Sequence, residues 1–144
     1  MGEQPAGAAA YAVARAWQTL ARHQVASAVA TALDFGSMVV LVQRLRLTPT
    51  AATGISAPLG ALANFWLGRA WVFPKSTGPL RGQAIRYVLV SAASAAWNTL
   101  GEHLVHGRLH AQYVLARALV AVAVSVLWNF PMQRHFVFPE GKVR

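Results

Sequence analysis

Four long hydrophobic runs divide the chain, and charged or turn-forming residues separate them. The runs cover residues 25–42, 51–68, 84–105 and 111–130. Each run holds about 18–22 residues, the number that an α-helix needs to cross about 30 Å of hydrocarbon at 1.5 Å per residue. Membrane-spanning strands are shorter and alternate in polarity, which these runs do not. The pattern therefore predicts an all-α integral membrane protein with four transmembrane helices.

The two ends of the chain differ from the hydrophobic runs. Residues 1–22 are rich in alanine and contain Trp17 between two arginines, so a flexible start followed by a short interfacial helix is expected. This start lacks the basic segment and compact apolar core of a cleaved signal peptide, which favours a mature protein that keeps its N-terminus. Residues 23–139 form the predicted membrane domain, and residues 140–144 form a short tail.

A motif occurs twice, once after the second run and once after the fourth. The segments NFWLGRAWVFP (residues 64–74) and NFPMQRHFVFP (residues 129–139) share Asn, Phe, Arg, Val, Phe and Pro at matching positions. The helices before them also align, one residue out of step, and this alignment pairs Asp34 with Asn98. The chain therefore reads as a tandem repeat of a two-helix unit.

The predicted copies of the repeat are residues 23–74 and residues 86–139. An even number of membrane crossings keeps the chain direction, so the halves are expected to be parallel repeats about an axis along the membrane normal. Both motifs then lie at the same membrane face.

The composition supports a membrane protein and gives its orientation. Hydrophobic residues make up 56% of the chain and charged residues 12%, about half the usual share in a soluble domain. The net charge is +9, and the basic residues that produce it lie mostly between the apolar runs, so an anionic lipid surface is a better partner than nucleic acid. By the positive-inside rule, both termini are expected in the cytoplasm, at the cell membrane. Nine basic residues lie on that side (Arg15, Arg22, Arg69, Lys75, Arg81, Arg86, Arg134, Lys142, Arg144) and four on the other (Arg44, Arg46, Arg108, Arg117).

Each motif combines groups that suit an anionic headgroup. Arg69 and Arg134 present planar forks of donors that match phosphate oxygens. Asn64 and Asn129 lie five residues earlier and can bond a ligand or a neighbouring helix. An ordinary interfacial belt would explain the aromatic residues but not this fixed spacing. Pro131, in the second copy, should end or kink the fourth helix early. The aromatic candidates are Trp66, Trp71 and Trp128.

In these features the chain resembles the GtrA-like family of small four-helix membrane proteins. The resemblance covers roughly residues 20–139 and rests on the two NF-x-x-x-R-x-aromatic-V-F segments, the Asp in the first helix and the four-helix layout. It implies a role in cell-surface polysaccharide or glycolipid assembly. Members move, or help to move, polyprenyl-phosphate-linked sugars across the cytoplasmic membrane, often beside a membrane glycosyltransferase.

Asp34 lies near the middle of the first run, about 15–18 Å along the helix from Arg22 and from Arg44. A charge at that depth is costly, so the carboxyl group needs a partner, a cavity, water or a proton. It could couple transport to protons or line a polar path for sugar hydroxyls. The structural alternative is a hydrogen bond between helices, for instance to Asn98.

Other polar residues of the runs have both structural and functional interpretations. Glu102 and Arg117 fall at a similar predicted depth near the outer face, where they could form a structural ion pair or an outer gate. His103 and His106 lie nearby, but no third ligand at suitable spacing supports a metal site. Trp97 is either buried packing or a stacking surface for a sugar or lipid. No catalytic constellation is visible, so neither an enzyme nor a cofactor is expected.

The resulting hypothesis is a protein that binds a polyprenyl-phosphate-linked sugar and promotes its flipping across the membrane. A homodimer is expected, because four short helices hardly enclose a path. The alternatives are a scaffold that recruits a polyprenyl-phosphate glycosyltransferase and a small proton-coupled exporter. The expected phosphate contacts are Arg69, Arg134, Lys75 and Arg86; the expected polar path is Asp34, Asn64, Asn98 and Asn129; the expected aromatic contacts are Trp66, Trp71 and Trp128.

Overall fold

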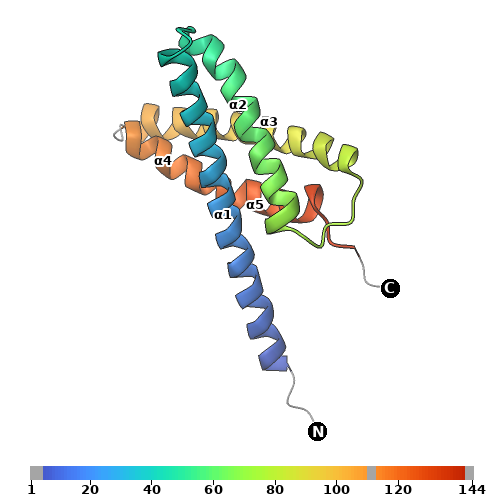
Figure 1. The fold of residues 1–144 in the computed structure, drawn as a ribbon. Coiled ribbons are helices and arrows are strands. Elements are labelled where there is room, and N and C mark those ends of the chain that lie inside the picture. The colour runs from blue at the N-terminus through green and yellow to red at the C-terminus, as the bar shows by residue number, and fades with distance from the viewer. Residues whose placement is uncertain (1–4, 110–112, 142–144) are drawn as a thin grey trace. The chain divides into compact units, whose positions relative to one another are not determined.

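The computed structural model describes residues 5–109 and 113–141, and most of these residues are helical, with no strand among them. The chain divides into two compact units, residues 1–74 and residues 75–144, and each unit holds one copy of the motif. Each unit contains a long helix followed by shorter helical segments (Figure 1). The predicted all-α fold with four principal helices is confirmed, whereas the parallel repeat and the side of the membrane on which the termini lie stay predictions.

The first unit is a helical hairpin. Helix α1 spans Pro5–Gln43, helix α2 spans Pro49–Leu67, and the π-helical turn η1 covers Gly68–Val72. Helices α1 and α2 pack side by side (Figure 1). The Thr48 hydroxyl caps α2 by accepting a hydrogen bond from the Ala51 N–H at 3.3 Å, which satisfies one of the donors that a helix start leaves unpaired.

Helix α1 begins much earlier than the hydrophobic pattern indicates. Its 39 residues correspond to a length of about 58 Å, nearly twice the thickness of a bilayer's hydrocarbon core. Residues 5–22, expected as a flexible start and a separate interfacial helix, form the first part of this same helix. In Figure 1 this part extends beyond the end of α2. Tyr11, Val13 and Trp17 are exposed on it.

Small residues let α1 and α2 approach closely. A Cβ atom built on Gly60 would lie 2.8 Å from the Asp34 Cβ and 2.9 Å from the Ala30 carbonyl oxygen, so no larger residue fits there unchanged. Ala52 and Ser56, on the same helix as Gly60, are completely buried. Helices in lipid associate through such close packing, because lipid tails are as apolar as the side chains themselves.

The second unit is built from more segments. Helix α3 spans Leu80–Leu109 and helix α4 spans Tyr113–Val124. The π-helical turn η2 (Ser125–Asn129), the short helix α5 (Phe130–Met132) and a further π-helical turn, η3 (Gln133–Val137), continue from α4. Helix α3 packs against α4 and against both π-helical turns.

The regular α-helix of the second unit is lost around Pro131, as expected. Proline has no N–H to continue the helical hydrogen bonds, and Pro131 opens α5 between two π-helical turns. In the turn before it, the Phe130 N–H bonds to the Ser125 carbonyl oxygen. Further back, α3 and α4 touch at Gly101, where an added Cβ atom would lie 2.6 Å from the Val120 Cγ1.

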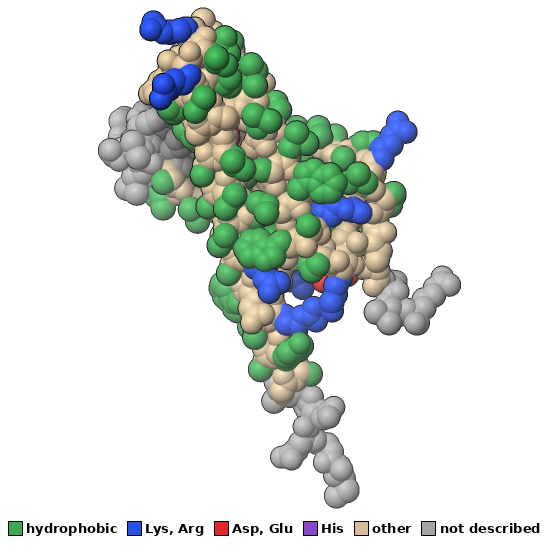
Figure 2. All heavy atoms as spheres, viewed as in Figure 1, with side chains coloured by type: hydrophobic (Ala, Val, Ile, Leu, Met, Phe, Trp, Pro, Cys, Tyr) green, Lys and Arg blue, Asp and Glu red, His purple; other side chains and the backbone are tan. Residues whose placement is uncertain are grey.

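Large hydrophobic side chains are exposed on α1, α2, α3 and α4. Val88 is 64% exposed, Val122 is 61% exposed and Leu127 is 76% exposed. Figure 2 shows hydrophobic side chains across the face in view, with Lys and Arg side chains at a few separate places. Apolar surface of this extent is unusual for a soluble monomer and is typical of contact with a membrane or another protein.

One helical stretch of the described residues, Gly7–Gln43, is long and apolar enough to cross a membrane, and an 18-residue window within it has a mean hydropathy of 1.9. The other predicted spans are helices but fall short of the same measure. Helix α2 contains Pro58 and several Gly, Ser and Thr residues, α3 carries Arg81 and Arg86 in its first turns, and the α-helical part of α4 has 12 residues. Multiple crossings therefore remain a prediction.

Candidate functional site

The two copies of the motif end in the same backbone conformation, each within its own unit. Both pass through a π-helical turn of five residues and leave it at a phenylalanine. Phe73 has φ −121° and ψ 58°, and Phe138 has φ −119° and ψ 56°. The Phe73 N–H donates to the Gly68 carbonyl oxygen at 2.8 Å, and the Phe138 N–H donates to the Gln133 carbonyl oxygen at 2.8 Å. The residues that the two motifs share thus go with the same backbone conformation, a π-helical turn that ends at phenylalanine.

The valine and phenylalanine that close each motif anchor it. Val72 and Phe73 are 4% and 3% exposed, and Val137 and Phe138 are completely buried. An extra residue per turn widens a π-helix and leaves it less stable than an α-helix, so such turns persist where packing holds them, frequently at functional sites. Here the buried valine and phenylalanine provide the packing that holds each π-helical turn, and with it the arginine on that turn.

In the first copy, the candidate residues lie along the end of α2 and on η1. Asn64 and Arg69 are half-buried, whereas Trp66 and Trp71 are 51% and 41% exposed. The Trp66 ring packs edge-on against Phe65, with centroids 5.8 Å apart. This copy therefore presents two exposed indoles beside a partly covered guanidinium.

In the second copy, Asn129 and Arg134 are also half-buried. Trp128 turns toward α3: its Nε1–H donates to the Val90 carbonyl oxygen at 3.2 Å, and its ring lies 6.0 Å from that of Trp97. Trp128 thus joins two helices, while the first copy has Ala63 at the corresponding position.

Arg86 joins the start of α3 to the second motif. Its Nη1 donates to the Phe136 carbonyl oxygen at 3.2 Å, and its guanidinium carbon lies 5.4 Å from the centre of the Phe136 ring. Arg86 is exposed, so a guanidinium edge still faces outward. Lys75, also expected near a phosphate, is exposed in the connection before α3. The structure thus brings Arg86 to the second motif.

Asp34 has a partner within its own hairpin. The Ser56 hydroxyl donates to the Asp34 Oδ1 at 2.6 Å, and both groups lie at the close contact made by Gly60. The Asn98 Nδ2 donates to the Ser94 carbonyl oxygen at 2.9 Å on its own helix. The structural interpretation of Asp34 as a bond between helices is therefore supported, with Ser56 as the partner, and a bond from Asp34 to Asn98 stays a prediction.

Several predictions concern residues on α3 and α4. Trp97 is 47% exposed and packs on Trp128, so both the packing and the stacking interpretations stay predictions. The side chains of Glu102, His106 and Arg117 lie outside the described residues, and the ion pair stays a prediction. His103 is exposed. No group of three metal-binding side chains occurs among the described residues.

Two polar residues of the site do not stand out in the sequence. Ser56 looks like one of many small residues in the second run, and its role depends on facing Asp34. Gln133 takes the place of Gly68 in the second motif; it is 4% exposed, and its Oε1 has no hydrogen-bond partner within the described chain. The sequence does contain one hint of this residue: the first motif has Gly68 where the second has Gln133.

The comparisons with known proteins agree with this arrangement. The sequence model of the GtrA/DPMS transmembrane domain matches residues 22–138, which include the first motif, the second motif up to Phe138 and all the principal helices from Arg22 onward. Searches of curated proteins and of solved structures found no match. Since the match covers far more than half of the sequence, the chain belongs to the GtrA/DPMS transmembrane-domain family.

Proposed function

We propose that this protein binds a polyprenyl-phosphate-linked sugar and promotes its transfer between the leaflets of the cytoplasmic membrane. Membership in the GtrA/DPMS family indicates a membrane protein of glycoconjugate synthesis. The proposal that the protein transfers this lipid rests on the motifs.

The observation that carries the proposal is the pair of motifs with one backbone conformation. Two arginines, Arg69 and Arg134, lie on matching π-helical turns that end in the same hydrogen bond. A general attraction to anionic lipid needs positive charge but no fixed geometry. Two matched, half-buried guanidinium groups suit the oxygens of a particular phosphate better.

In the proposed binding mode, Arg69 and Arg134 contact the phosphate, with Lys75 and Arg86 as further cationic groups. The exposed indoles of Trp66 and Trp71 are placed to stack on a sugar ring or to lie at the headgroup boundary. The proposal puts both motifs at one cytoplasmic face, as an even number of crossings between them predicts.

The proposed sugar path uses Asn64, Asn98 and Asn129, whose amide groups both donate and accept hydrogen bonds. Asp34 has a smaller part in it, because its carboxylate already accepts from Ser56. The lipid tail would stay in the bilayer while the headgroup crosses. The proposal includes four crossings, cytoplasmic termini and a homodimer that encloses the path.

The test is reconstitution of the protein in vesicles with a labelled polyprenyl-phosphate-linked sugar, followed by measurement of leaflet transfer. We expect transfer by the native protein and its loss in the Arg69→Ala, Arg134→Ala double variant. The control is Arg44→Ala with Arg108→Ala, which removes the same charge from the opposite predicted face. Absence of transfer by the native protein would reject translocation. Equal transfer by the two double variants would reject the phosphate site.

A scaffold for a glycosyltransferase is the second candidate, and the first part of α1 favours it. This part extends beyond α2 and exposes Tyr11, Val13 and Trp17 along a continuous helix (Figure 1). An exposed helix of this kind suits contact with another protein or with the membrane surface. Co-purification of a glycosyltransferase that is lost when residues 1–18 are deleted, with no transfer in vesicles, would favour recruitment.

A further inference from the structure

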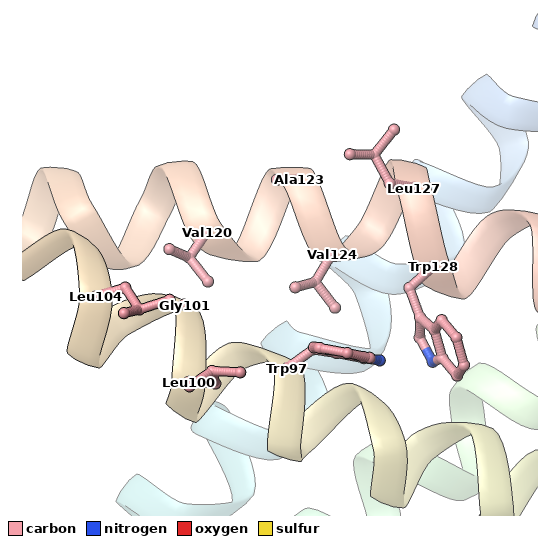
Figure 3. Close-up of a pocket in the computed structure, with 9 residues that line it drawn as sticks. All are labelled: Trp97, Leu100, Gly101, Leu104, Val120, Ala123, Val124, Leu127 and Trp128. Atoms are coloured by element: carbon pink, nitrogen blue, oxygen red, sulfur yellow. The ribbon is translucent and has the colours of Figure 1, made fainter.

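The second unit contains an open apolar groove between α3 and α4, with a volume of about 410 Å³ (Figure 3). Its α3 side consists of Trp97, Leu100, Gly101 and Leu104, and its α4 side of Val120, Ala123 and Val124. Leu127 and Trp128, on η2, complete it. Trp97 and Trp128 lie together at one end of the groove (Figure 3). All of the lining side chains are apolar or aromatic.

The contacts of α3 fix where this groove lies relative to the second motif. On α3, the Arg86 guanidinium stacks on the Phe136 ring. One turn further on, the Val90 carbonyl accepts a hydrogen bond from the Trp128 indole N–H, and beyond it Trp97 packs on the Trp128 ring. The groove starts at this pair of indoles and continues along α3 to Leu104. Trp97 lies eleven positions after Arg86, about 16 Å along the helix. The basic end and the apolar groove are therefore consecutive along one helix.

We infer that this groove holds the isoprenoid chain of the polyprenyl phosphate, an inference that rests on the function proposed above. An amphiphile with an anionic head matches the order of the site: guanidinium groups of Arg86 and Arg134 first, then the indole pair, then branched aliphatic side chains. The phosphate lies at the basic end and the chain runs from it along α3 into the groove.

The chemistry of the lining fits this occupant. The one polar atom of Trp128 is bonded to the Val90 carbonyl, so its ring offers an apolar face. Gly101 has no side chain, which brings Val120 against α3 and shapes the floor between Leu100 and Leu104. The acyl chains of membrane lipids are as apolar as an isoprenoid chain, so the hydrophobic effect does not favour one over the other in the groove. Selectivity for the methyl-branched chain therefore comes from shape and van der Waals contact.

The direct test uses a polyprenyl phosphate that carries a diazirine in its chain, cross-linked to the native protein in vesicles and mapped by mass spectrometry. We expect cross-links at Leu100, Leu104 and Ala123, and competition by unlabelled polyprenyl phosphate. Cross-links spread evenly over other exposed residues, such as Val88 and Val122, would overturn the groove as the chain site. A phospholipid with the same label that cross-links equally at the groove would overturn its selectivity for an isoprenoid.

A binding experiment separates this inference from the proposed function. We expect the native protein to bind a long polyprenyl phosphate roughly tenfold more tightly than geranyl phosphate, which has a short chain. Ala123→Trp, which fills the groove, should remove this preference while geranyl phosphate still binds. Ala121→Trp, an exposed neighbour outside the lining, should keep it. A preference unchanged by Ala123→Trp overturns the groove alone, whereas no binding of either phosphate by the native protein overturns the proposed function.

Discussion

The Arg86 guanidinium and the Phe136 residue are joined twice, by a hydrogen bond of 3.2 Å to the backbone carbonyl and by the stacking of the cation at 5.4 Å from the ring centre. The two residues are fifty positions apart in sequence. Their contact fastens the second π-helical turn to the start of α3, so the position of Arg134 depends on a residue outside the motif.

Replacing Arg86 should therefore loosen the second motif. We expect Arg86→Ala to lower the free energy of unfolding by about 1–2 kcal/mol, the sum expected from one exposed cation–π contact and one exposed hydrogen bond. The measurement is thermal unfolding in detergent. Arg81→Ala removes a comparable exposed charge five residues earlier on the same helix and should change the melting temperature little. Equal losses in the two variants would contradict a specific role for Arg86.

The Ser56 variant tests the partner of Asp34. Ser56→Ala leaves the carboxylate without its donor inside the hairpin and should destabilise the protein by about 1–3 kcal/mol. Asp34→Asn keeps an acceptor at the same position and should cost less. We also expect Asp34→Asn to retain leaflet transfer, with the same rate with and without a pH gradient. Loss of transfer only in this variant would instead identify Asp34 as a proton-coupling group, as the exporter hypothesis requires.

Gly60 tests the close contact of α1 and α2. Gly60→Val should destabilise the hairpin by roughly 1–3 kcal/mol, because its side chain would collide with Asp34 and with the backbone of α1. Gly54→Ala, on the same helix with nothing within 4 Å, is the matched control. The control should be neutral or slightly stabilising, since alanine favours a helix by about 1 kcal/mol over glycine. Helix content and melting temperature, followed together, distinguish the two results.

Gln133 gives a prediction in which stability and activity separate. A buried amide oxygen without a partner costs free energy, so Gln133→Leu should leave the melting temperature unchanged or raise it. Because this oxygen is enclosed by protein and lies outside the proposed sugar path, the same variant should transfer the lipid at the native rate. Gln133→Glu, which puts a carboxyl group at the same buried position, should lower the melting temperature and is the companion variant. Slower transfer by Gln133→Leu at an unchanged melting temperature would contradict this expectation.

The sequence was informative wherever its signal is periodic or repeated. Run lengths gave the four principal helices, and the fixed spacing of Asn, Arg, Val, Phe and Pro pointed to both motifs and to the family. The pairing of Asp34 with Ser56 was not accessible, because it depends on the rotation of α2 about its axis. The extension of α1 to Pro5 was missed because the prediction followed hydrophobic runs. The alanines of this segment have a high helix propensity but do not form such a run.

The π-helical turns could not be read from the residues themselves. Whether an N–H bonds to the carbonyl four or five residues earlier is decided by packing, here by the buried Val72 and Val137 and the phenylalanines after them. Likewise, the contact between Arg86 and Phe136 follows from how η3 lies against α3. Proximity of Arg69 to Arg134 remains a prediction.

The additional π-helical turn η2 bears on how the two halves diverged. From Asp34 to Asn64 the chain advances 30 residues, and from Asn98 to Asn129 it advances 31. A π-helical turn contains one residue more than an α-helical turn, and η2 ends at Asn129, the first residue of the second motif. Among the described residues of the first unit, η2 has no counterpart. A single-residue insertion can thus be absorbed inside a helix without rotating the arginine that follows it. Deleting one residue from Ser125–Leu127 should convert η2 to α-helix and restore the spacing of the first half.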